Sequence, residues 1–210
     1  VEKFMSRMRA MGVGDGHRVV VYDGAGLMSA ARVWWLFRHM GKMDVAVLDG
    51  GLPKWVAEDR PVEDMPPIVR DRHMTASRDA TLVKDVTQVA LASKLNQAEI
   101  VDARAPERFR GDAPEPREGL RAGHIPGSKN VPFKTLLNDD STMKPVDELK
   151  AVFEGAGVDL NRPIITTCGS GVTATILALA LERIGHRDYA VYDGSWSEWG
   201  SYDDLKVDVG

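Results

Sequence analysis

The chain has 210 residues, a length that allows one large domain or one domain and part of another. Apolar residues make up 43% of the chain and charged residues 28%, which excludes a disordered chain, a collagen-like repeat and a coiled coil. The formal net charge of −4 provides no overall field that would attract nucleic acid or an anionic membrane surface, so we expect neither as a partner.

Strand-like and helix-like stretches alternate from the start of the chain. Residues 19–22 form a short β-branched run that predicts a strand. Residues 28–40 contain neither glycine nor proline and predict a helix that ends at Gly41, and residues 45–48 predict a second strand. This order is typical of a parallel sheet flanked by helices, so we expect an α/β fold.

The same pattern returns about 145 residues later in the chain. A strand-like run at 164–167 matches the one at 19–22, and Cys168 follows it where the first copy has Asp23. The match extends to further residues at the end of each copy, namely Asp49, Gly50 and Trp55 against Asp193, Gly194 and Trp199. We therefore predict two related α/β units.

The two units are expected to differ in extent. The second contains a strand at 100–102 and a turn at 123–127 that have no counterparts in the first, so we expect the first unit to be incomplete at its N-terminal side. A charged stretch with three prolines, at about 57–77, predicts a linker. We place an inactive first unit with this linker at residues 1–75 and the second, catalytic unit at residues 76–210.

The longest uninterrupted apolar run, residues 176–181, is far shorter than the roughly 20 residues that cross a bilayer, so we expect no membrane span. The single cysteine, Cys168, excludes an internal disulfide and a site with several thiolate ligands. It fits a reducing, cytoplasmic location. The five histidines lack metal-ligand spacing, so we expect neither a metal nor a cofactor.

Cys168 is the strongest candidate for chemistry. It follows a predicted strand and precedes a glycine-containing loop and a helix predicted at 174–184, which places the thiol at the ligand-binding edge of a parallel sheet. Backbone amides at the helix start favour the thiolate, so we expect an exposed, nucleophilic and oxidisable cysteine. The alternative is an inert cysteine that packs as a small hydrophobic residue.

Four motifs of the second unit together resemble the rhodanese family. They are Cys-Gly-Ser-Gly-Val-Thr-Ala at 168–174, Asp-Gly-Ser-Trp at 193–196, Gly-His-Ile-Pro-Gly at 123–127 and Asp-Ala-Arg at 102–104. More narrowly, they resemble the two-domain sulfurtransferases that use 3-mercaptopyruvate. The resemblance implies that Cys168 takes sulfur from this donor as a persulfide, releases pyruvate, and passes the sulfur to cyanide or to a thiol such as reduced thioredoxin. It also implies an inactive first domain, as Asp23 in place of a cysteine suggests.

The resemblance also assigns roles to individual residues. Arg108 and Arg117 would bind the carboxylate of the donor, because a guanidinium grips a carboxylate with two hydrogen bonds. The backbone amides of the loop would hold the reacting sulfur; its residues are Gly169, Ser170, Gly171, Val172 and Thr173. Ser170 either hydrogen-bonds the substrate or only stabilises the loop. We expect Arg104 to be structural and to pair with a neighbouring acid.

Three other functions compete with sulfur transfer from 3-mercaptopyruvate. A cysteine phosphatase of this fold needs an arginine six positions after the cysteine, and Ala174 stands there. A thiosulfate sulfurtransferase stays open, although Gly169 and Ser170 stand where such enzymes usually carry basic residues that would attract a dianion. A non-catalytic rhodanese-like binding module also stays open, although such modules often lack the cysteine.

Overall fold

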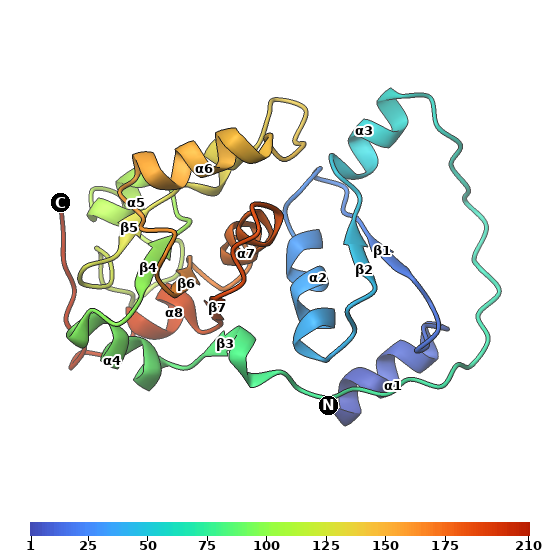
Figure 1. Cartoon of the computed structure of the whole chain (residues 1–210), viewed down its shortest axis with the longest axis horizontal. Coiled ribbons are helices and arrows are strands. Elements are labelled where there is room, and N and C mark those ends of the chain that lie inside the picture. Colours follow the sequence, from blue (N-terminus) through green and yellow to red (C-terminus); the bar gives the residue numbers. More distant parts are fainter. The chain divides into compact units, whose positions relative to one another are not determined.

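The computed structural model describes all 210 residues and divides them into two compact units (Figure 1). The first comprises residues 1–80 with 140–142, and the second comprises residues 81–139 with 143–210. The elements of the first unit are α1 (Glu2–Ala10), β1 (Val19–Val21), α2 (Ala30–His39), β2 (Val45–Val47) and α3 (Gly51–Ala57). The strands and the helix predicted at 19–48 are therefore confirmed, each within a few residues.

The first unit is built around α2 and a two-stranded parallel sheet. β1 and β2 pair in parallel, with Val19 opposite Val45. α2 lacks glycine and proline and buries Trp34, Trp35 and Phe37 on the side that faces the unit's interior. The edge-to-face contact between Phe37 and Phe4 of α1, with ring centroids 5.5 Å apart, ties the first helix to this core.

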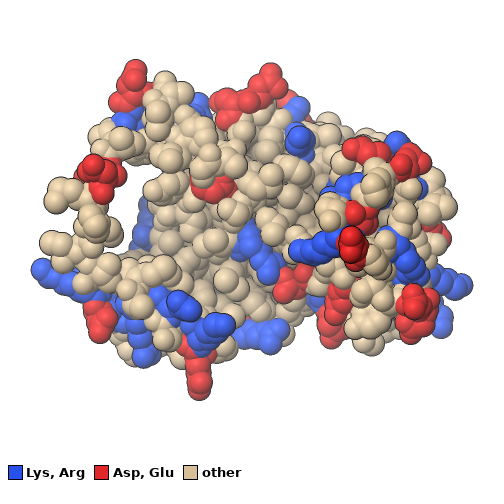
Figure 2. Space-filling view, turned by 180° about the vertical axis from the view of Figure 1, so that it is seen from behind, with Lys and Arg blue, Asp and Glu red and all other residues tan.

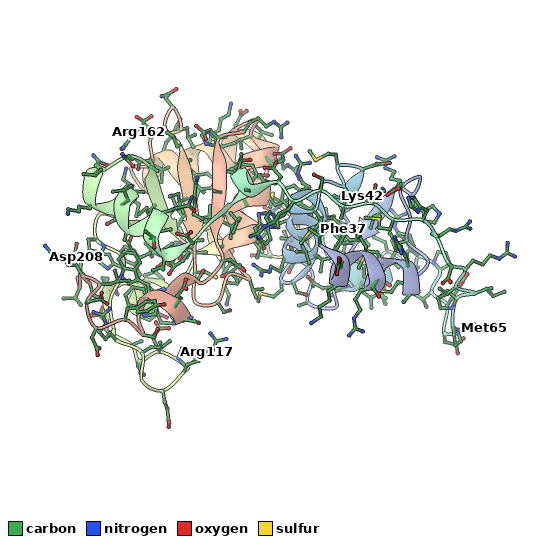
Figure 3. The ribbon with its side chains drawn as sticks, turned by 90° about the horizontal axis from the view of Figure 1, so that it is seen from below. Phe37, Lys42, Met65, Arg117, Arg162 and Asp208 are labelled. Carbon is green, nitrogen blue, oxygen red and sulfur yellow. The ribbon has the colours of Figure 1, made fainter.

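The segment after α3 runs around the first unit without helix or strand until residue 80 (Figure 1). Its middle stands away from the rest of the unit, with Met65 at its far end (Figures 2 and 3). Its later part is fixed to the unit, because Met74 is buried and Asp15 accepts hydrogen bonds from the amide and hydroxyl of Thr75 at 2.8 and 3.1 Å. The predicted linker is thus an irregular segment whose second half packs against the first unit.

The second unit contains a five-stranded, wholly parallel sheet in the order β3-β7-β6-β4-β5. Its strands are β3 (Val83–Lys84), β4 (Glu99–Asp102), β5 (Lys129–Asn130), β6 (Ile164–Thr167) and β7 (Tyr189–Tyr192). Its helices are α4 (Val86–Leu95), α5 (Pro106–Arg110), α6 (Val146–Gly155), α7 (Ala174–Arg183) and α8 (Ser195–Trp199), with 3-10 turns η1 (Ala80–Leu82) and η2 (Phe133–Leu136). The α/β fold with parallel strands flanked by helices is confirmed.

The three central strands of this sheet are buried along their whole length, as expected of a parallel sheet covered on both faces. α4 and α8 pack with the sheet in a cluster that contains Val89, Ile100, Ile165, Tyr192 and Trp196. α7 packs on β6 and β7 and is buried over most of its circumference. The longest helices have ten residues, and none has the length and apolar character that a membrane span requires.

Parallel strands bring their carboxyl ends to one edge of the sheet. β4, β6 and β7 end at Asp102, Thr167 and Tyr192, and each continues directly into a loop at that edge. α5, α7 and α8 begin just beyond these loops. Because this edge is where ligands bind in open α/β sheets, the loops after the three strands define the candidate site.

Candidate active site

Cys168 is the first residue after β6 and lies inside the protein. Its exposed fraction is 1%. Three hydrogen bonds hold the loop down: the amides of Trp196 and Ser197 donate to the carbonyls of Cys168 and Gly169, each at 2.9 Å, and the amide of Cys168 donates to Ser195 Oγ at 3.2 Å. The expectation of an exposed thiol is therefore wrong, because the start of α8 covers the loop.

The sulfur nevertheless lies in an environment suited to a nucleophile. Gly171 donates its amide to Sγ of Cys168 at 3.1 Å, an arrangement that favours negative charge on the sulfur. Gly171 has a φ of +77°, a conformation in which a side chain would be strained, so the loop needs glycine at this position. α7 then begins at Ala174, as predicted.

Cys168 lies at the wall of a cavity of about 230 Å³. The cavity is lined by residues from the loops after β4, β6 and β7, namely Arg108, Glu115, Pro116, Arg117, Leu120, Cys168, Gly169, Ser170, Val172, Thr173 and Ser197. Every predicted site residue except Gly171 lines it, and Gly171 contacts the sulfur directly. The structure therefore brings the predicted residues together, while their roles remain predictions.

The two arginines reach the cavity in different ways. Arg108, in α5, lies so close to the loop that a Cβ atom at Gly169 would come within 2.9 Å of its Nη2 atom. A side chain at position 169 would thus push the guanidinium away. Arg117 lies on the irregular loop after α5 (Figure 3) and donates to the hydroxyl of Ser197, which in turn donates to the carbonyl of Gly169.

Arg104 forms a buried ion-pair cluster behind the cavity. Its guanidinium donates to Asp102 Oδ2 at 2.7 Å and to Glu115 Oε1 at 2.8 Å, and it lies 4.4 Å from the ring centroid of Trp196. The prediction that Arg104 pairs with a neighbouring acid is confirmed. Arg104 and Asp102 are both 1% exposed, so each needs the other to remain charged in the interior.

Three residues near the site were not identified from the sequence as functional. Glu115 bridges Arg104 and Arg108, Ser197 links Arg117 to the loop, and Ser195 links the amide of Cys168 to Tyr192. The only sequence signal for Glu115 is its position in Pro-Glu-Pro-Arg, while Ser195 lies in the motif at 193–196 without an assigned role and Ser197 lies just beyond that motif.

The loop that begins at Asp23 in the first unit has the same backbone arrangement as the loop that begins at Cys168 in the second. Gly26 has a φ of +104° where the second unit has Gly171, and Leu52 donates to the carbonyl of Asp23 at 3.0 Å just as Trp196 donates to that of Cys168. These equivalent bonds support the internal repeat found in the sequence. The two loops differ in the side chain at their start, a partly buried Asp23 in the first unit and a buried Cys168 in the second.

The carboxylate of Asp23 occupies the centre of the first loop. The amide of Ala25 donates to Oδ1 at 2.9 Å, and the amides of Met28 and Ala30 donate to Oδ2 at 2.8 Å each. Partial burial opposes ionisation, but these hydrogen bonds hold the pKa of Asp23 below its ordinary value. Three amides of this segment are therefore already bound to the protein's own carboxylate.

Comparison with known proteins identifies the relatives of the chain. The rhodanese-like domain family matches residues 2–58 and 87–202. The 3-mercaptopyruvate sulfurtransferase of Escherichia coli (strain K12) is 43% identical over 207 residues, which cover 99% of this chain and 73% of the relative. The mitochondrial thiosulfate/3-mercaptopyruvate sulfurtransferase 1 of Arabidopsis thaliana is 40% identical over 230 residues, covering 99% of this chain and 60% of the relative. The chain thus spans 60 to 73% of the length of these relatives.

Solved structures of similar proteins have the same fold as this chain. The crystal structure of the E. coli 3-mercaptopyruvate sulfotransferase SseA superposes with a TM-score of 0.83 at 41% identity, over 93% of this chain and 73% of that one. The yeast Tum1 protein superposes with a TM-score of 0.86 at 29% identity, over 94% of this chain and 71% of that one. The chain therefore belongs to the rhodanese family, and within it the chain resembles the two-domain sulfurtransferases of the 3-mercaptopyruvate type.

Proposed function

We propose that this protein transfers sulfur from 3-mercaptopyruvate to an acceptor through a persulfide on Cys168. The observation that carries the proposal is the position of Cys168 at the wall of a cavity that also contains two arginines, with a loop amide donating to its sulfur. A nucleophile, an anion-binding group and a stabilising amide are the components that sulfur transfer from a carboxylate-bearing donor requires.

The donor would bind through its charged end. Arg108 and Arg117 supply planar guanidinium groups for its carboxylate and carbonyl oxygens, leaving its sulfur to approach Cys168. The thiolate of Cys168 then attacks that sulfur, and the carbon–sulfur bond breaks with its electron pair passing into the enolate of pyruvate. The enolate carbon takes the proton of the new persulfide, which releases pyruvate and leaves an anionic persulfide.

The second half-reaction returns the enzyme to its starting state. A thiolate acceptor attacks the outer sulfur, the sulfur–sulfur bond breaks, and its electron pair returns to Sγ of Cys168. Cyanide would react in the same way to give thiocyanate. A protein thiol such as reduced thioredoxin would fit a cytoplasmic location, where the single unpaired cysteine would stay reduced.

Thiosulfate is the second candidate donor. The Arabidopsis relative named above carries thiosulfate in its name, and two arginines in one cavity would also attract a dianion. The neutral residues Gly169 and Ser170 beside the nucleophile favour the singly charged donor instead. A purely non-catalytic module is disfavoured by the intact loop around Cys168.

Catalysis would belong to the second unit alone. The first, residues 1–75 with the linker, holds Asp23 where a nucleophile would stand, and its loop amides are already bound to that carboxylate. A carboxylate cannot form a persulfide, so Asp23 could not carry the sulfur. The residues to which this proposal assigns roles, Cys168, Arg108, Arg117 and the loop 169–173, all lie within residues 76–210.

Intact-protein mass spectrometry tests the proposal directly. The reduced protein is mixed briefly with 3-mercaptopyruvate or with thiosulfate, and peptide mapping locates any added sulfur. We expect one added sulfur atom on Cys168, formed faster from 3-mercaptopyruvate, and none on a folded Cys168→Ser variant. Faster loading from thiosulfate would favour the second donor, and the absence of an adduct from either donor would refute sulfur transfer by this chain.

A further inference from the structure

Glu115 is the only acidic side chain that lines the cavity, and it is almost completely buried. Its side chain is 2% exposed, whereas Arg108 beside it is 26% exposed. A buried carboxylate is tolerated only when it is paired and hydrogen-bonded, and Glu115 has two arginine partners. Glu115 thus joins a buried arginine to one of the two arginines expected to bind the donor.

The carboxylate holds Arg108 at two points. Oε2 accepts from Nη2 of Arg108 at 2.5 Å, and Oε1 accepts from Nε at 3.3 Å. This side-on grip fixes the plane of the guanidinium and leaves Nη1 as the group not used by Glu115. Because the same guanidinium lies against Gly169, Glu115 determines where Arg108 stands relative to the loop of Cys168.

Glu115 is itself fixed from behind. Oε1 also accepts from Nη1 of Arg104 at 2.8 Å, and Arg104 is held by Asp102 and by the carbonyl of Gly123 at 2.8 Å. The chain of contacts therefore runs from Asp102 at the end of β4, through Arg104 and Glu115, to Arg108 in the cavity. Each member except Arg108 is almost completely buried, so these contacts are shielded from solvent.

The charges of this cluster nearly cancel. Asp102 and Arg104 neutralise one another, as do Glu115 and Arg108. Arg117 bonds to a serine hydroxyl, which carries no charge. Apart from the reacting thiolate of Cys168, which faces either donor alike, the charged side chains that line the cavity are Arg108, Glu115 and Arg117, and their formal charges sum to a single positive charge.

We propose that Glu115 is a positioning residue that orients Arg108 and, by neutralising it, makes the cavity prefer singly charged donors over dianions. The proposal rests on the sulfur-transfer function above. With Glu115 present, a donor with one carboxylate balances the net charge of the cavity lining. A dianion such as thiosulfate would bring one negative charge more than that lining can balance.

Substitution of Glu115 by glutamine tests the inference, because it keeps the shape and an acceptor oxygen but removes the charge. We expect the ratio of kcat/KM for thiosulfate to kcat/KM for 3-mercaptopyruvate to rise about fivefold to tenfold, as one unit charge near the donor should produce. Glu107→Gln is the matched control, since Glu107 is an exposed neighbour of Arg108 on α5 and should leave the ratio unchanged. A ratio that moves less than twofold, or moves equally in the control, would overturn the inference.

Glu115→Asp separates charge from geometry. It keeps the negative charge but shortens the grip on Arg108, so we expect both values of kcat/KM to fall and their ratio to stay within twofold of the wild type. If Glu115→Gln does not fold, Glu115→Asp still tests the inference. A rise of more than twofold in the thiosulfate-to-3-mercaptopyruvate ratio of kcat/KM, with the negative charge retained, would contradict the role of charge.

A binding measurement without turnover distinguishes failure of this inference from failure of sulfur transfer. Calorimetry on Cys168→Ser protein, with and without Glu115→Gln, would compare the affinities for sulfate and pyruvate. We expect the glutamine variant to favour sulfate by about fivefold to tenfold relative to pyruvate, whether or not the wild type transfers sulfur. Unchanged relative affinities in a folded variant would overturn the inference.

Discussion

Ser195 combines an unfavourable backbone conformation with a hydroxyl that accepts a hydrogen bond from the amide of Cys168. It is fully buried and has a φ of +51°, a left-handed conformation that costs a residue with a side chain about 1–2 kcal/mol. Its hydroxyl accepts from the amide of Cys168 at 3.2 Å and donates to the carbonyl of Tyr192 at 2.8 Å. The equivalent residue of the first unit is Gly51, at a φ of +58°. Ser195 therefore has a strained backbone that glycine would relieve, and its two hydrogen bonds offset that strain.

Two substitutions at this position should destabilise the protein in an unusual order. Ser195→Ala keeps the strain, removes both hydrogen bonds and leaves the buried amide of Cys168 without its acceptor, so we expect a loss of about 2–3 kcal/mol in the free energy of unfolding. Ser195→Gly loses the same hydrogen bonds but relieves the strain, so it should be more stable than the alanine variant by about 1 kcal/mol. In a helix interior glycine would instead be the less stable residue.

Urea unfolding monitored by tryptophan fluorescence would measure this order, with Ser201→Ala as a control for loss of an exposed serine hydroxyl in the same region. Persulfide formation on Cys168 should also be slower in both Ser195 variants, because the amide of Cys168 is no longer held. The strain argument would be refuted if alanine were as stable as glycine. The hydrogen-bond argument would be refuted if both variants matched the wild type.

Two further predictions concern charged groups. Asp23→Asn should destabilise the protein by about 1 kcal/mol at neutral pH, since hydrogen bonds to a charged acceptor are stronger than those to a neutral one. The hydrogen bonds to Asp23 lower its pKa in the folded state, so the stability it contributes is present above its ordinary pKa of 3.8 and is lost as the pH falls below that value. The difference in free energy of unfolding between the wild type and Asp23→Asn should therefore be smaller near pH 3 than at neutral pH. A difference that stays constant with pH would contradict this prediction. Arg108→Ala and Arg117→Ala should each raise the KM for 3-mercaptopyruvate about tenfold or more. Arg110→Ala is the control, because Arg110 pairs with Asp112 outside the cavity. If either Arg108→Ala or Arg117→Ala left the KM unchanged, the substituted arginine would not belong to the site.

Much of the fold could be predicted because its signals are local. Short apolar runs ended by glycine mark the strands, and the helix after Cys168 has no glycine or proline until Gly185. The internal repeat presents the same pattern a second time, so the equivalence of Asp23 and Cys168 follows from the order of residues alone. The shared hydrogen bond to the carbonyl of each residue supports that prediction.

The burial of Cys168 could not be predicted in this way. The groups that cover its loop are amides of Trp196 and Ser197, which come from another strand-to-helix connection in the sheet. Glu115 is a similar case, because an acid on a proline-rich stretch usually lies in solvent. Its burial depends on Arg104, eleven residues earlier, and on Arg108, and only the tertiary arrangement shows that both guanidinium groups converge on it.

The two loops together explain why a persulfide suits the second unit. The oxygens of an aspartate and the outer sulfur of a cysteine persulfide each lie two bonds beyond Cβ, and in the first unit the oxygens of Asp23 accept hydrogen bonds from the amides of Ala25 and Met28. The repeat makes Ser170 and Thr173 the equivalents of these two residues. Without a bound sulfur, Sγ of Cys168 accepts a hydrogen bond from the amide of Gly171. A second sulfur, about 2 Å further out, would extend toward the amides that correspond to those gathered by the first unit's carboxylate. Under the proposed function, the same backbone loop would hold a permanent anion in the first unit and a transient one in the second, and the choice between aspartate and cysteine would separate a structural loop from a catalytic one.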